Sequence, residues 1–289
     1  MKVFFLLFFV PFFSSTMLSQ EHEFLGVIKF SQTSMISYRL VFTEVNGKID
    51  GYSVTDLQGE NETKNKITGT YNSKTRILDF KEKDIEYTKS IVSKNNFCYL
   101  HFTGKVTISE KSSIKGKFNG LFKDGKECIN GSLELVGSKK AFDRITKINQ
   151  KFQKSKKIDP VIKENVDLNK TVSSLKVNTL RKNEKTSFFV DSASIQIEIW
   201  DNAKEDGDEV SIYVDDKILL KNYKALNEKK YLNVPLDKMI TTIRIEANNT
   251  GTIGKNTVVF AFSDNKAKIE LISDLEKNDI TTIRIIKEK

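Results

Sequence analysis

Five acidic residues gather in one short turn of this 289-residue chain, and carboxylates grouped in this way are suited to hold a hard cation. Asp201, Asp206 and Asp208 lie there with two glutamates, around Gly207. Ca²⁺ takes about six to eight oxygen ligands from carboxylates, carbonyls and water. The turn is therefore a candidate calcium site, with Asp201, Asp206 and Asp208 as its candidate ligands. The alternative is a solvated hairpin whose acids cap main-chain amides.

A second group of polar residues could bind a ligand. Asp56, Glu60, Asn61 and Glu62 occupy a loop between two expected strands, and such loops often carry ligand contacts. Trp200, the only tryptophan, could present a flat face to a sugar. The alternatives are a self-capped solvated loop and a tryptophan that anchors the core. We take these five residues as candidate ligand-binding residues.

Catalytic chemistry finds little support in the sequence. The only histidines are His22 and His101, and His101 falls within an expected strand. There is no G-x-S-x-G, H-E-x-x-H or phosphate-binding glycine loop. We name no catalytic residue and favour a non-enzymatic protein. A hydrolase that cleaves glycans with two carboxylates is the distant alternative.

The elements that carry these residues are expected to be strands. Residues 21–137 contain short alternating segments separated by turn residues, and glycine recurs in the middle of several of them. Mid-strand glycine permits the sharp coiling of a small barrel. Eight or nine such strands predict an antiparallel meander barrel that is lipocalin-like in strand rhythm, with a sandwich as the alternative. Its many Phe and Tyr residues are expected to be core, and some could line a pocket.

Residues 186–289 predict a second β domain. Ile195, Ile197 and Ile199 alternate with polar neighbours, and Asp215-Asp216 reads as a two-residue hairpin turn. The hexapeptide ITTIRI occurs at Ile240 and again at Ile280, which suggests two similarly placed strands. Strands at this spacing favour an antiparallel β-sandwich. The predicted fold class is therefore all-β, a barrel and a sandwich.

A basic segment, residues 138–185, joins the two domains. It holds 14 Lys and Arg against 5 Asp and Glu, which accounts for the whole net charge of +9. Residues 139–154 form an amphipathic helix, expected to pack on the barrel or to contact a membrane surface. The rest is expected to be a linker with an edge strand near 173–177. Residues 156–185 contain no aromatic residue that could stack on bases, so a nucleic-acid partner is not expected.

Residues 1–20 have the layout of a signal peptide, with Lys2, an apolar run from Val3 to Phe13, and small polar residues. Export permits a disulfide, and Cys98 and Cys128 are the only cysteines. We predict that they form one; free buried thiols are the alternative. The protein is therefore expected in the periplasm, at the cell surface or outside the cell.

Two regions carry a resemblance to a known group of proteins. The segments WDNAKEDGDEVSIYVDDKILLKNY, ANNTGTIGKNTVVFAF and SDLEKNDITTIRI resemble a domain of uncharacterised secreted proteins of Bacteroidetes-type bacteria. The segment GYSVTDLQGENETKNKITGTY is similar to their N-terminal part. The first half resembles lipocalins and avidins only in the spacing of its short strands and turns, and it lacks the lipocalin G-x-W motif. The resemblance implies an exported two-domain β protein and no assigned activity.

These observations together predict an exported binding or interaction protein. The candidate partners are an envelope protein, a glycan or a small apolar ligand, and Ca²⁺ is the candidate cofactor. A structural or adhesive envelope protein is the alternative function.

Overall fold

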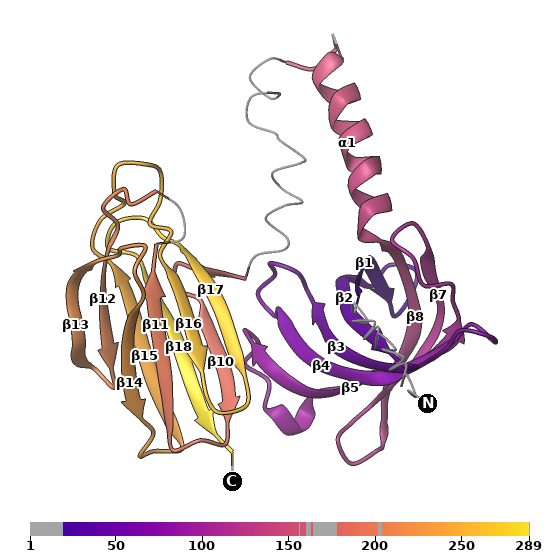
Figure 1. Ribbon diagram of the computed structural model, residues 1–289, viewed down its shortest axis with the longest axis horizontal. Helices are drawn as coiled ribbons and strands as arrows, with labels where there is room; N and C mark the ends of the chain where they lie inside the picture. The colour runs from indigo at the N-terminus through magenta and orange to yellow at the C-terminus, as the bar shows by residue number, and fades with distance from the viewer. Residues whose placement is uncertain (1–19, 156, 160–162, 164–177, 202–203, 289) are drawn as a thin grey trace, which may run out of the picture.

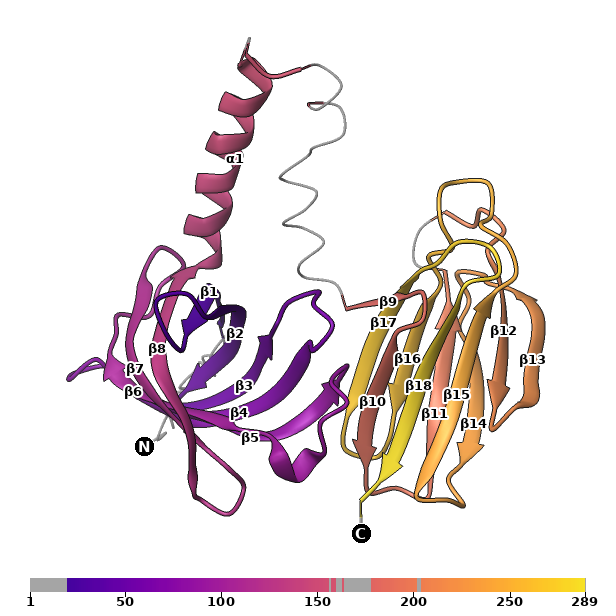
Figure 2. The ribbon, with the colours of Figure 1, turned by 180° about the vertical axis from the view of Figure 1, so that it is seen from behind.

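The computed structural model describes residues 20–155, 157–159, 163, 178–201 and 204–288 (Figures 1 and 2). They form a closed antiparallel barrel, a two-sheet sandwich and one long helix, which confirms the predicted all-β class. The predicted signal peptide lies outside the described residues except for Gln20, and so does the edge strand expected near 173–177. None of the described helices is long and apolar enough to cross a membrane.

The barrel is a meander in which each strand pairs with the next. Strand β1 also pairs with β8, and β5 with β6, so the sheet closes on itself. A short 3-10 helix, η1 (Lys94–Asn96), lies between β5 and β6. The strands are β1 (Glu21–Lys29), β2 (Met35–Val45), β3 (Lys48–Thr55), β4 (Thr63–Asn72), β5 (Ile77–Thr88), β6 (Tyr99–Lys105), β7 (Ser113–Leu121) and β8 (Glu127–Gly137).

Strand β5 is longer than the sequence suggested. The sequence alternates in two separate segments, TRILDFK and DIEYTKSIV, which by themselves predict two strands, yet both contribute to one strand of 12 residues. Its pairing with β4 shifts register between Lys64 and Asn65 and again between Lys66 and Ile67. Such bulges bend a strand and increase its twist. The bent strand pairs with β6 through its first half and ends beside the sandwich.

Buried side chains fill the barrel, and glycines let its strands approach one another. Phe24 and Phe42 stack at a centroid distance of 5.9 Å, and Phe80 and Phe102 lie 5.5 Å apart. A Cβ on Gly69 would lie 2.0 Å from the carbonyl oxygen of Asp79 on β5. Only glycine therefore fits this close crossing, as the expected coiling requires.

The predicted disulfide is present. Cys98 precedes β6 and Cys128 lies in β8, and their sulfurs are bonded across a Cα–Cα distance of 6.0 Å. The intervening strand β7 passes close by, because a Cβ on Gly120 would lie 2.5 Å from the sulfur of Cys98. The bridge joins the two strands that flank β7.

Helix α1 (Ser138–Lys154) follows β8 directly and projects from the barrel (Figure 1). Its contact with the barrel is near its beginning, where the Lys140 N–H donates to the Glu110 carbonyl at 3.3 Å. Ala141 is the only buried residue of the helix, and Ile148 is 55% exposed. The expectation that it packs along the barrel is therefore wrong. The helix continues from the end of β8 and so points away from the barrel wall.

The sandwich contains two five-stranded layers. One layer continues the barrel sheet in the order β13-β12-β15-β18-β10, and the other has the order β14-β11-β16-β17-β9. All pairings within these layers are antiparallel except β10–β18 and β17–β9. The strands are β9 (Thr179–Arg181), β10 (Lys185–Val190), β11 (Ser194–Trp200), β12 (Glu209–Val214), β13 (Lys217–Lys224), β14 (Lys230–Pro235), β15 (Ile240–Ala247), β16 (Val259–Ser263), β17 (Lys268–Asp274) and β18 (Ile280–Lys287).

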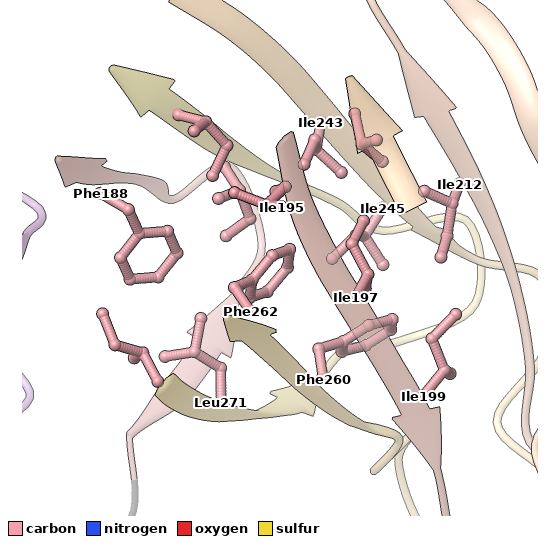
Figure 3. Packing of buried hydrophobic residues seen from close by; sticks show 14 of the residues in the cluster. Phe188, Ile195, Ile197, Ile199, Ile212, Ile243, Ile245, Phe260, Phe262 and Leu271 are labelled. Atoms are coloured by element: carbon pink, nitrogen blue, oxygen red, sulfur yellow. The ribbon is translucent and has the colours of Figure 1, made fainter. Parts of the chain in front are cut away.

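The alternating residues that predicted this domain form its core. Ile195, Ile197 and Ile199 of β11 lie beside Phe260 and Phe262 of the neighbouring strand β16, and together they face the inner side chains of the opposite layer (Figure 3). All of them are nearly fully buried. The predicted hairpin turn joins β12 to β13 with positive φ angles at both aspartates, as a two-residue turn requires.

The two ITTIRI segments are neighbouring strands. Strand β15 starts at the first copy and β18 at the second, and they pair antiparallel with Ile243 opposite Ile283. Each copy therefore supplies the same alternation to one layer of the core. This agrees with the prediction of two similarly placed strands.

The barrel and the sandwich share one sheet. Ser187 and Phe188 of β10 pair with Thr88 and Tyr87 of β5, so thirteen strands of the described chain form a continuous hydrogen-bonded sheet. Strand β9 and the first residue of β10 lie within the segment predicted as linker. The domains are thus joined edge to edge.

Candidate functional site

A pocket opens where the barrel meets the sandwich, and we call it the junction pocket. It has a volume of about 190 Å³, which is below the roughly 300–1,000 Å³ of sites for drug-sized ligands. Both domains line it: Lys66, Asp84, Ile85 and Glu86 from the barrel, and Phe188, Phe189, Val190, Asp191, Ile195, Phe262, Ser263, Asp264, Lys266, Ala267, Ile269, Ile285 and Glu288 from the sandwich.

The floor of the junction pocket is apolar. Phe188 and Phe262 lie with ring centroids 5.5 Å apart and an interplanar angle of 30°. Ile195, Ile269 and Ile285 stand beside them in the sandwich core. Phe188 comes from one layer and Phe262 from the other (Figure 3). The pocket therefore ends on buried side chains of the sandwich core, and an apolar group bound there would be removed from water.

Charged residues surround the entrance. Lys266 is paired with Asp191. Lys94 lies 2.7 Å from Asp84 and is also paired with Glu288. These ion pairs hold the rim side chains in place around the apolar floor. The arrangement suits a ligand with an apolar body and a polar end.

A second polar group is buried inside the barrel. Glu82 is 4% exposed, and its Oε1 accepts hydrogen bonds from Ser53 at 2.6 Å and Tyr38 at 2.9 Å. Its Oε2 accepts one from the Leu100 N–H at 2.8 Å. Burial raises the pKa of Glu82, and these bonds, with one from Asn65, oppose the rise. The group is closed to solvent, so we assign it a structural role.

The acidic turn lies at the other end of the sandwich from the junction pocket (Figure 1). Asp208 is 1% exposed and Asp201 is 4% exposed. Burial raises the pKa of Asp208, and the negative charges of Asp206 and Asp201 add to the rise. The structure thus brings the three predicted calcium ligands near one another. In the part of the chain that is described, however, no three such side chains converge closely enough to hold a metal.

The predicted ligand loop between β3 and β4 is stabilised by hydrogen bonds among its own residues. The Asp56 carboxylate accepts the Asn61 N–H at 3.0 Å, and its carbonyl accepts the Gly59 N–H at 2.7 Å. Glu60 is exposed. Glu62 is 3% exposed and lies 3.6 Å from Lys89, the residue that follows β5. These four residues do not line the junction pocket. Their role as ligand contacts stays a prediction.

Trp200 ends β11 beside the acidic turn and is partly exposed. The ammonium of Lys229 lies 4.3 Å from the centroid of its ring. This cation already occupies one face of the indole, so a sugar would have to stack on the other. Trp200 is also remote from the junction pocket lining.

The histidines are dispersed. His22 of β1 lies 5.5 Å from the ring of Phe42, and burial lowers its pKa. His101 of β6 also has a lowered pKa, first through burial and then through the charge of Lys81. Neither lines the junction pocket. The non-enzymatic interpretation and the membrane contact of residues 139–154 stay predictions.

Comparison with protein-family models, with curated proteins and with solved structures finds no match for this chain. The resemblance to secreted Bacteroidetes-type proteins therefore stays a prediction, and the site has to be judged on its own geometry. Sequence reasoning missed the junction pocket, because its lining comes from segments between residues 66 and 288. The burial of Glu82 could have been predicted from the sequence. It follows Leu78 and Phe80 at a spacing of two residues, so its side chain is expected on the same inward face of the strand.

Proposed function

We propose that this is an exported, non-enzymatic binding protein whose junction pocket takes a small ligand with an apolar body and a polar end. The observation that carries the proposal is the pocket between the two domains, where the buried rings of Phe188 and Phe262 form an apolar floor within a charged rim. Ligand sites are typically concave, combine apolar lining with polar groups that orient the ligand, and often lie between domains. The barrel interior is packed with its own side chains, so we place the ligand at the junction.

Export is supported by two features of the chain. Residues 1–20 have the composition of a signal peptide. The bond between Cys98 and Cys128 is of a kind that persists in oxidising compartments. Both favour a ligand met outside the cytoplasm.

The proposal is tested by filling the pocket. We expect small aromatic and aliphatic acids, alcohols and amines, screened by ligand-observed NMR, to include binders of the purified protein. The substitution Ala267→Phe places a ring in the pocket and should abolish their binding. Ile218→Phe, an exposed position of β13, is the matched control and should leave binding unchanged. A screen without binders, or binders indifferent to Ala267→Phe, would contradict the proposal.

A second candidate, a structural or adhesive role, is favoured by the terminal strands of the sandwich. Ile218 on β13 is 56% exposed and Tyr231 on β14 is 55% exposed, and both strands are sheet edges. Exposed edges can pair with another chain, although lysines such as Lys217 and Lys221 oppose this. If these edge strands bind a partner, the double substitution Ile218→Lys, Tyr231→Lys should remove binding to envelope fractions. It should leave unchanged the binding of the small molecules found in the NMR screen.

A further inference from the structure

The acidic turn contains two carboxylate oxygens that are buried without a donor. Asp208 is 1% exposed, and its Oδ1 has no hydrogen-bond partner in the part of the chain that is described. The Oδ1 of Asp206 is also buried and without a partner there. Burying a carboxylate oxygen is unfavourable unless a donor or a cation compensates. We propose that the acidic turn binds Ca²⁺, with Asp206 and Asp208 as its carboxylate ligands.

Each carboxylate is held by its other oxygen. Asp206 Oδ2 accepts the Ile253 N–H at 3.1 Å, and Asp208 Oδ2 accepts the Thr257 N–H at 2.7 Å. Both donors belong to the connection between β15 and β16, which meets the acidic turn at this end of the sandwich (Figure 1). The side chains are therefore oriented by one oxygen and leave the second for a metal. Such orientation by neighbouring groups is typical of metal ligands.

The backbone of Gly251 lies against one of these oxygens. It has a φ of +59°, and a Cβ there would lie 2.7 Å from Asp206 Oδ1. Any other residue would therefore place an atom against this oxygen. Asn249 fixes the same loop, because its side-chain amide donates to the Gly207 carbonyl at 2.9 Å. The backbone beside Asp206 Oδ1 therefore belongs to a loop that is itself tied to the acidic turn.

The electrostatics favour a cation. The charges that act on Asp208 come from Asp206 and Asp201, and both are negative. Asp201 is 4% exposed and adds to this negative field. A divalent cation would be attracted by all three side chains and would relieve their mutual repulsion.

Calcium is the cation that these ligands suit. Carboxylates are hard ligands, and Ca²⁺ accepts about six to eight oxygens in flexible geometry, whereas Mg²⁺ demands a regular octahedron. Because no three acidic side chains of the described chain converge, main-chain carbonyls and water must complete the coordination. A site with two carboxylates belongs to the weak class of extracellular modules, with dissociation constants of roughly 0.1–1 mM.

Terbium provides a direct test, because Trp200 precedes Asp201 in the chain. Tb³⁺ bound at the acidic turn should emit when this single tryptophan is excited, and Ca²⁺ should displace it. We expect Asp206→Asn and Asp208→Asn each to weaken Tb³⁺ binding by about tenfold or more, since ligand charge sets affinity. Asp216→Asn, in the exposed hairpin at the opposite end of β12, is the control and should bind as the parent does.

A thermal melt of the parent protein keeps the test independent of how the variants fold. After dialysis against a chelator, Ca²⁺ should raise the melting midpoint relative to NaCl of equal ionic strength, because a cation bound only by the native state stabilises it. No Ca²⁺-dependent shift would overturn the proposal. Unchanged Tb³⁺ emission in the folded Asp208→Asn variant would overturn it as well. The NMR screen of the junction pocket is unaffected by either result.

Discussion

At the scale of the residue, Glu82 is the side chain whose ionisation matters most to the barrel. It lies in the interior with three hydroxyl or amide side chains and one main-chain N–H directed at its carboxylate. These donors favour the ionised form, while burial disfavours it more strongly and raises the pKa. A folded-state pKa above the unfolded value means that the native protein binds the additional proton.

We predict that Glu82 makes the protein less stable as pH rises. Between the unfolded pKa, near the ordinary 4.5, and the higher folded pKa, the native state holds more protons than the unfolded state. The free energy of unfolding then falls with increasing pH across this window. The substitution Glu82→Gln should remove this dependence of the unfolding free energy on pH. It should also lower stability by about 1–3 kcal/mol, because the NH2 group of the glutamine would face hydrogen-bond donors and leave buried groups unpaired. Urea unfolding from pH 4 to 8 measures both effects.

Glu60→Gln, on the exposed part of the loop between β3 and β4, is the control for this experiment. It should keep the stability and the slope of the parent. Parallel curves for the parent and Glu82→Gln would show that the Glu82 pKa is the same in both states and would contradict the prediction.

At the scale of the element, the barrel depends on strands that lie unusually close. A Cβ on Gly51 would lie 2.1 Å from the Val41 carbonyl of β2, much as Gly69 meets β5. The same closeness is found around β7, where Gly120 lies beside the disulfide. The bond between Cys98 and Cys128 therefore secures the strands that return to β1 and complete the closure.

We predict that removing the disulfide destabilises the protein substantially. The bond closes a loop with a sequence separation of 30, and a loop of this length contributes roughly 3–4 kcal/mol through the entropy of the unfolded chain. Guanidinium unfolding of the Cys98→Ala, Cys128→Ala double variant should show this loss. The reduced parent should unfold like the variant. A variant as stable as the oxidised parent would contradict the prediction.

At the scale of the whole molecule, a buried polar cluster couples the two domains. Lys89 lies 3.6 Å from Glu62 and 3.1 Å from Glu184, and it donates to the Thr179 carbonyl at 3.1 Å. Glu62 belongs to the barrel, and the other two partners to the sandwich side. Nearby, Tyr87 packs edge-on against Phe188 at 6.1 Å. Together with the pairing of β5 and β10, these contacts make the junction a continuous interior.

We predict that Lys89→Met uncouples the domains. The variant keeps most of the side-chain volume but leaves Glu62 without Lys89. Glu184 loses Lys89 as well and keeps Arg181 at 3.9 Å. Breaking a buried pair from one side typically costs about 3–5 kcal/mol. Calorimetry should change from one cooperative transition to two at separate temperatures. Lys126→Met is the matched control, because its ion pair with Asp124 is exposed. A single unshifted transition in Lys89→Met would argue that the domains are coupled by other contacts.

Much of the local structure could be predicted from the sequence. Alternation assigned each strand's inner face, as in Ile195, Ile197 and Ile199, because successive side chains point to opposite sides of a sheet. The strand boundaries were harder to predict. The bulges that let β5 run on as one strand arise from its pairing with β4, which the local sequence does not specify. The helix at 138–154 was predicted from its periodicity, yet its direction is set by where β8 ends.

What the sequence determined by itself was most of the strands, their buried faces and the pair of cysteines, because these depend on residue type and short spacing. Only the tertiary structure decided that β5 joins both β6 and β10, that the junction pocket exists, and which donors surround Glu82. Strand partners distant in the sequence are chosen by the packing of the whole chain. Groups brought together in this way leave no local pattern by which they could have been found.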